Sequence, residues 1–271
     1  MKRRRENIVF FLASAAAISA AAVILLCLFV LIEGWPLFKK VGLPSFLFGT
    51  IWEPGKGEFG ILPMLAGSVA VTLGALILAV PLAVGTALLL SEFAPKKFAS
   101  FMRPAIELLA GIPSVVYGFF GLVFLVPHLR ILFGGSGFSI LAGSIILTVM
   151  ILPTIASISE DAIRAVPKSY REGSLALGAT SWETARNVVL PAARSGIITA
   201  IILGLGRALG ETMAVLMVTG NVAVFPHSIT SPVRTLTGNI ALEMGYATGL
   251  HRSALFATGI VLFVVIIILT L

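Results

Sequence analysis

Six long stretches of almost unbroken apolar residues constrain this chain more than any other feature. They cover residues 8–32, 61–90, 104–126, 138–158, 195–218 and 253–271. A helix needs about 20 apolar residues to cross a bilayer, so each stretch is long enough to span. Because the sequence lacks a series of short alternating strands, the backbone must satisfy its hydrogen bonds within helices. The sequence therefore predicts an all-α membrane protein, a polytopic bundle of six transmembrane helices.

The composition agrees with this fold class. The chain is 58% hydrophobic and 11% charged, whereas soluble domains carry about 25% charged residues. The net charge of +7 could suit nucleic acid, but no compact basic region is left over to bind it. The basic start precedes an apolar run too long for a signal peptide, so we expect a retained first helix. We divide the chain into residues 1–60, the first helix and first outer loop, and 61–271, the main transmembrane domain.

The distribution of basic residues predicts the orientation. The N-terminus and the second and fourth loops hold twelve Lys and Arg residues, whereas the other three loops hold six. Cytoplasmic loops carry the excess of positive charge in membrane proteins. We therefore expect a multi-pass protein of the cytoplasmic membrane with both termini in the cytoplasm.

The longest polar segment, residues 159–194, lies on the predicted cytoplasmic side. Ser169 with Glu172 and Thr180 with Glu183 each have the spacing of a capping box, in which the two side chains satisfy helix amides reciprocally. Gly178 separates the two predicted helices, and Pro191 is expected to end or kink the second. A simple joint needs about 2–8 residues. The extra length favours a docking hairpin, although an amphipathic connection alone remains an alternative.

Two charged residues fall inside the fifth apolar stretch. Arg207 lies about 18 Å along a helix that begins at Ser195, taking about 1.5 Å per residue, which is near the middle of the bilayer. Glu211 is one turn further on the same predicted face. Such charges are costly in a membrane and need a partner or a polar path. Two interpretations stay open: a buried ion pair that neutralises itself, or an Arg207 fork that contacts an oxyanion and is oriented by Glu211.

The remaining polar residues suggest no enzyme or metal site. Arg103 and Glu107, four residues apart, are expected to form an interfacial ion pair. Three scattered histidines, His128, His227 and His251, have no metal-ligand spacing, so no metal is expected. The sequence also lacks the Gly-x-x-x-x-Gly-Lys-Ser/Thr phosphate loop. We therefore expect that the chain is not an enzyme and binds no cofactor of its own.

The polar segment resembles a known loop. Glu172, Gly178, Leu190 and Pro191 fit the E-A-A-x3-G-x9-I-x-L-P pattern of permease subunits in ABC importers, which have the MetI-like transmembrane fold. The residues that depart from it are Gly173, Ser174 and Val188. In that family the loop seats on a separate ATPase. The resemblance implies that Ser169, Glu172, Gly173, Gly178, Thr180, Glu183, Leu190 and Pro191 form the ATPase-coupling loop.

A second stretch narrows the resemblance. Residues 206–215, which include Arg207 and Glu211, resemble the C-type membrane subunit of phosphate importers. The similarity extends from about Phe59 to the end of the sequence. It implies an A-type sister permease, a cytoplasmic ATPase dimer that binds ATP and Mg, and an extracytoplasmic phosphate-binding protein. Alternatives are a permease for molybdate or sulfate, or an ATP-independent channel or secondary transporter.

Overall fold

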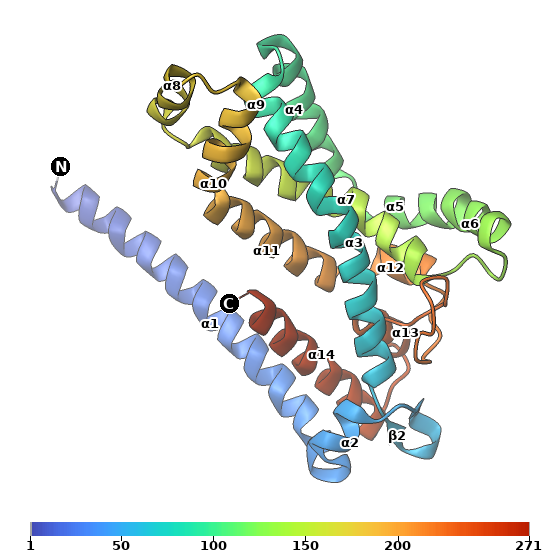
Figure 1. The fold of residues 1–271 in the computed structure, drawn as a ribbon. Coiled ribbons are helices and arrows are strands. Elements are labelled where there is room, and N and C mark those ends of the chain that lie inside the picture. Colours follow the sequence, from blue (N-terminus) through green and yellow to red (C-terminus); the bar gives the residue numbers. More distant parts are fainter. Residues whose placement is uncertain (1, 271) are drawn as a thin grey trace.

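The computed structural model describes the backbone of residues 2–270 and the side chains of residues 11–270. Figure 1 shows a bundle of long helices, with α8 and α9 at one end and α2 and β2 at the other. The helices are α1 (Lys2–Val41), α2 (Leu43–Phe48), α3 (Leu62–Leu88), α4 (Lys96–Gly111), α5 (Ser114–Phe120), α6 (Val126–Phe133), α7 (Ile140–Arg164), α8 (Lys168–Ala176), α9 (Ser181–Thr184), α10 (Leu190–Ala192), α11 (Arg194–Gly210), α12 (Met213–Val218), α13 (Leu236–Glu243) and α14 (Gly249–Thr270).

Shorter elements join or extend these helices. Three π turns continue α3, α5 and α9: η2 (Leu89–Phe93), η3 (Gly121–Leu125) and η4 (Ala185–Val189). The first loop forms a small antiparallel hairpin, in which β1 (Trp52–Glu53) pairs with β2 (Glu58–Phe59) around the 3₁₀ turn η1 (Pro54–Lys56). The described part of the chain is therefore almost wholly helical.

The prediction of a six-helix membrane bundle is confirmed. Five helical segments are long and apolar enough to cross a membrane, and residues 181–210 form a sixth crossing if their bent helix pair counts as one span. That pair is bent by 69°. Since these segments leave little polar surface along their length, the bilayer serves as their solvent.

Two predicted spans are broken rather than continuous. The third was expected to run through Pro113, but α4 ends at Gly111 and α5 begins at Ser114. A proline cannot donate a hydrogen bond and disfavours the helical conformation of the residue before it. Ile112 is accordingly extended, with ψ 129°. The fifth span is broken after α11, because Glu211 is also extended, with ψ 133°.

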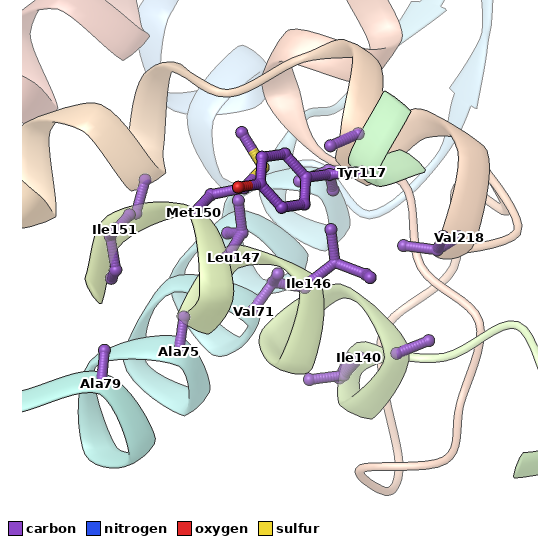
Figure 2. Packing of buried hydrophobic residues seen from close by; sticks show 14 of the residues in the cluster. Val71, Ala75, Ala79, Tyr117, Ile140, Ile146, Leu147, Met150, Ile151 and Val218 are labelled. Carbon is purple, nitrogen blue, oxygen red and sulfur yellow. The ribbon is translucent and has the colours of Figure 1, made fainter. Parts of the chain in front are cut away.

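The centre of the bundle is the pair α3 and α7. Their contact is lined on the α3 side by small residues, including Ala75 and Ala79, which belong to one buried cluster with Leu147 and Ile151 of α7 (Figure 2). Two α7 hydroxyls also donate to α3 carbonyl oxygens: Ser144 to Val71 at 3.1 Å and Thr148 to Ala75 at 3.2 Å. Close packing of small residues with such hydrogen bonds is the usual way in which membrane helices associate.

A second apolar core lies at the opposite end from α8. There α1 packs along α14, and α2 and the β-hairpin cover their ends (Figure 1). Its fully buried side chains include Leu37, Phe46, Ile61 and Leu255. This second core anchors the first loop to the last helix.

Candidate functional site

The α8–α10 hairpin, residues 168–192, differs in one respect from the prediction. Its first helix begins at Lys168, with Pro167 as the N-cap residue and no side-chain capping bond. The predicted capping box of Ser169 and Glu172 is therefore wrong. Pro167 is extended and starts the helix two residues earlier than predicted, which places Ser169 inside the first turn, where it cannot serve as the cap.

The turn at Gly178 has the predicted form. The φ angle of Gly178 is +88°, a left-handed conformation that strains other residues. The amide of Ala179 donates to the Ser174 carbonyl oxygen at 3.3 Å, and that of Gly178 donates to Leu175 at 3.0 Å. These two bonds make a Schellman motif, which satisfies the last carbonyl groups of α8.

The second helix of the hairpin begins with the predicted capping box. The Glu183 amide donates to the Thr180 hydroxyl at 3.2 Å, and the Thr180 amide donates to the Glu183 carboxylate at 2.8 Å. Hydrogen bonds from the Thr180 amide and hydroxyl lower the pKa of Glu183 below its ordinary value. Pro191 does not end this helix at Leu190, since the helix continues to Ala192 before bending into α11. The π turn just before Pro191 adjusts the backbone where proline lacks an amide hydrogen.

The hairpin presents apolar side chains to its surroundings. Leu177, at the turn, is 91% exposed, and Tyr170, Leu175 and Trp182 are also exposed. None of the α8 residues is buried. Exposed apolar groups in this number mark an interaction surface.

Arg171 connects the hairpin to the bundle, and sequence reasoning gave it no role. Its guanidinium donates to both carboxylate oxygens of Glu92, with distances from 2.6 to 3.1 Å. It also donates to the carbonyl oxygens of Val166 at 2.7 Å and Ile163 at 2.9 Å. The hydrogen bond to Glu92 raises the pKa of Arg171, against the opposing effect of burial. Glu92 lies 79 positions away, so no local pattern could have indicated the pair.

A second polar cluster lies where α4 meets α7. The expected pair between Glu160 and Arg164 is present at 3.8 Å. The sequence predicted that Arg103 pairs with Glu107. In the structure Arg103 pairs with Glu160 instead, at 2.6 Å. The packing of α4 against α7 explains the difference, because it places Arg103 beside the buried Glu160, while Glu107 is exposed.

Arg207 and Glu211 do not form the predicted arrangement. Arg207 is exposed near the end of α11, and Glu211 lies beyond the end of that helix. Among the side chains that the structure describes, the two form no ion pair. The Glu211 carboxylate instead accepts from the Ala214 amide at 3.2 Å and caps α12, while its carbonyl oxygen accepts from Thr237 at 2.9 Å. The interpretation of a self-neutralising pair is therefore wrong, because the helix break removes Glu211 from the α11 face.

The two broken spans meet. Gly118 of α5 lies against Ala214 of α12, where an added Cβ would come 2.9 Å from the Ala214 Cα. Across the other break, the Tyr117 hydroxyl donates to the Leu109 carbonyl oxygen at 2.8 Å. Arg207 lies near the end of α11, next to the break at Glu211, beyond which α12 packs on α5. Irregular backbone at membrane depth occurs where it is enclosed by protein or lines a polar cavity, and broken helices often surround transport sites.

A third polar cluster holds the opposite end of the bundle together. The Glu243 carboxylate accepts from Arg234 at 2.6 Å and from the Trp52 indole at 2.9 Å, and it contacts the His251 ring nitrogen at 2.8 Å. The Glu243 side chain is only 9% exposed. His251 thus belongs to a structural network, and the described residues contain no group of three or more potential metal ligands. The sequence gave no sign of this network, because its members come from four separate segments.

The fold and these sites define an integral membrane transport subunit: a helical bundle with an exposed terminal hairpin and an exposed arginine beside two broken spans. Residues 79–271 match the family model described as the binding-protein-dependent transport system inner membrane component. The chain belongs to this family, the inner-membrane permease subunits of ABC importers.

Curated relatives agree with this family. The chain is 45% identical over 246 residues to the probable ABC transporter permease protein YqgH of Bacillus subtilis, covering 88% of this chain and 80% of the relative. It is 37% identical over 256 residues to the phosphate transport system permease protein PstC of Haemophilus influenzae, covering 87% and 81%. It is 40% identical over 241 residues to PstC of Xylella fastidiosa, covering 82% and 74%.

A solved structure has the same fold. A chain in the inward-facing MetNI methionine ABC transporter matches with a TM-score of 0.62 and 21% identity, covering 81% of this chain and 94% of that one. At this identity the match concerns the fold alone, and it confirms the expected MetI-like architecture.

Proposed function

We propose that this chain is the C-type permease subunit of an ATP-driven importer of inorganic phosphate. The observation that carries the proposal is Arg207, an exposed arginine without an ion-pair partner among the described side chains, placed beside two broken spans. A guanidinium offers a fork of donors to a tetrahedral oxyanion. Relatives at 37–40% identity that are named as phosphate transport permeases support phosphate as the substrate.

The α8–α10 hairpin is the proposed seat of a separate ATPase dimer, which binds ATP and Mg. We place this hairpin and both termini in the cytoplasm, in accord with the excess of basic residues on that side. Glu172 is exposed and forms no ion pair within the described part of the chain, so it is available to a partner. Nothing lies within 4 Å of a Cβ placed on Gly173, which leaves room for close approach.

The other hairpin positions singled out from the sequence act through the shape of the hairpin. Gly178 fixes the turn, while Thr180 and Glu183 fix the start of the second helix. Leu190 and Pro191 lie next to the bend that leads into α11. Ser169 remains in the proposed surface as an α8 residue, without the capping role.

In the proposed path, Arg207 contacts the anion transiently, since transport requires release as well as binding. Glu211 does not neutralise Arg207. Its carboxylate instead caps α12 and so holds the break beside which the arginine lies. An uncovered charge at this depth is costly, so we propose that an A-type sister permease covers the Arg207 side and encloses the path. An extracytoplasmic phosphate-binding protein would deliver the anion at the end that carries the β-hairpin.

The test is phosphate uptake by the assembled transporter with Arg207→Gln. Uptake should fall to background while the ATPase still copurifies, because glutamine keeps the polarity and removes the charged fork. Arg130→Gln, at an exposed position on α6, is the matched control and should leave uptake unchanged. Normal uptake by Arg207→Gln would remove the anion role.

Two further measurements separate the alternatives. Competition of labelled phosphate with molybdate and sulfate identifies the preferred oxyanion, and stronger competition by either would assign that anion instead. Copurification with an ATPase, and loss of uptake when its ATP is withdrawn, separates an importer from an ATP-independent channel or secondary transporter.

A further inference from the structure

The α8 helix is attached to the bundle chiefly by polar contacts. No α8 residue is buried, and the helix has no apolar face of its own inside the core. Its two cross-links are the Arg171 cluster and a hydrogen bond of 2.9 Å between the hydroxyls of Ser174 and Thr184. The first contact ties α8 to the bundle and the second ties it to α9, in addition to the short link of residues 165–167 between α7 and α8.

Arg171 joins α8 to two membrane helices at once. Glu92, which accepts two parallel hydrogen bonds from it, lies in the π turn that ends α3. The carbonyl oxygen of Ile163 lies in the last turn of α7 and that of Val166 lies just beyond it, at the helix C-terminus, which favours a nearby cation. The Arg171 and Glu92 side chains are only 21% and 14% exposed, so solvent screens the pair weakly.

The two helices that Arg171 contacts, α3 and α7, pack together as one unit. α3 and α7 share the main apolar core and the hydroxyl–carbonyl bonds described above. The other arm of the hairpin continues instead into α11, through the 69° bend, and α11 carries Arg207. The first arm thus reaches α3 and α7 through Arg171, whereas the second arm leads directly into α11, which itself packs on α7 and α3.

We infer that the Arg171–Glu92 pair transmits the movement of the docked ATPase to α3 and α7. This inference rests on the proposed function and adds a positioning residue to it. Arg171 acts through Glu92 and the end of α7, and it is not part of the surface that holds the ATPase. When the pair is lost, the ATPase stays bound and continues to hydrolyse ATP, but hydrolysis no longer opens the transport path efficiently.

A purely stabilising role makes a different prediction. If Arg171 only kept the hairpin folded, its removal would lower assembly, ATP hydrolysis and uptake together. If it transmits movement, ATP hydrolysis continues and the amount of phosphate moved per ATP falls. The ratio of transport to hydrolysis is therefore the readout that distinguishes the two.

The experiment uses the complete transporter in proteoliposomes, with ATP hydrolysis and phosphate uptake measured in the same preparation. Arg171→Lys keeps the charge but removes the two-pronged contact, Glu92→Gln keeps the size but removes the charge, and the double variant combines them. Arg130→Lys is the matched control, since Arg130 is exposed on α6, outside the hairpin, and has no ion-pair partner among the described side chains.

We expect phosphate transported per ATP to fall at least about fivefold in both single variants, with ATPase copurification intact. The double variant should fall no further, because both changes remove one contact. An unchanged ratio in Arg171→Lys and Glu92→Gln would overturn the inference, and so would loss of the ATPase from Arg171→Lys alone, which would make Arg171 a docking residue. Failure of the wild-type chain to bind any ATPase would instead contradict the proposed function.

Discussion

Replacement of Glu243 by glutamine tests how strongly the buried polar network holds the first loop to the last helix. The carboxylate is 9% exposed and serves three partners, one of them the guanidinium of Arg234 at 2.6 Å. Glu243→Gln keeps the size of the side chain but leaves Arg234 without its counter-charge. Breaking a buried ion pair by removing one partner costs about 3–5 kcal/mol. Arg234 keeps its bonds to Asn239 and to the Asn221 carbonyl, so we expect the lower end of this range.

The corresponding change in melting temperature is large enough to measure. For proteins of roughly this size, each kcal/mol shifts the Tm by about 2–4 °C, so a loss of about 3 kcal/mol predicts a fall of about 6–12 °C. Trp52→Phe removes one neutral donor and keeps the aromatic contact with Phe59, so its fall should be smaller. The assay is the fraction of permease that remains monodisperse in size-exclusion chromatography after heating in detergent.

The control lies in the same β-hairpin. Glu53 pairs with Lys56, but their side chains are 48% and 74% exposed, so water competes for both charges. Glu53→Gln should leave the melting temperature unchanged within error. Equal melting temperatures for Glu243→Gln and Glu53→Gln would refute the reasoning, because burial would then not change how much a charged pair stabilises the fold.

Three further predictions concern the α8–α10 hairpin. Gly178→Ala should cost roughly 1–2 kcal/mol, because it forces a left-handed conformation on a residue with a Cβ, and it should weaken ATPase copurification. Gly173→Ala, in a helical and open position, should not destabilise the hairpin. Thr180→Ala should loosen the second helix while Ser169→Ala should not, as measured by the mobility of a spin label at position 186; equal effects would contradict the observed caps. The pKa of Glu183 is lowered by folding, so its stabilisation is complete above the ordinary value of 4.5 and is lost as the pH falls through the folded value. The same spin label should therefore report no change in the hairpin between neutral pH and pH 5, which is about half a unit above the ordinary pKa. The hairpin should loosen only in stronger acid. Loosening at higher pH would contradict the role given to Glu183.

Local patterns predicted the parts of this structure that depend on near neighbours in the sequence. Apolar length predicted the membrane crossings, and the turn at Gly178 and the cap at Thr180 follow from bonds that span three to five residues. The cap predicted at Ser169 failed for a local reason too, since Pro167 starts the helix two residues earlier.

Local sequence patterns could not predict that two of the spans are broken. Membrane helices often tolerate proline, so Pro113 alone could not distinguish a kink from a break. The break at Glu211 has no proline at all. It depends on α12 packing against α5 and on Thr237 donating to the Glu211 carbonyl oxygen, both of which are contacts between distant segments.

The polar clusters were missed for the same physical reason. The Arg171–Glu92 contact joins positions 79 apart, and the Trp52–Glu243 contact joins positions 191 apart. A charged residue in a loop gives no sign of which distant partner the fold will bring to it. The residue types were visible in the sequence, but their pairing depends on how the helices pack.

The separation of Trp52 and Glu243 along the chain also determines the order in which these two segments can meet during synthesis. A ribosome that adds about 5–20 residues per second takes roughly 10–40 s to synthesise the intervening 191 residues. During that interval the β-hairpin has already emerged, and its indole donor has no carboxylate to meet. The first loop can therefore reach its final position only after α13 has been made, so this end of the bundle is completed late in synthesis.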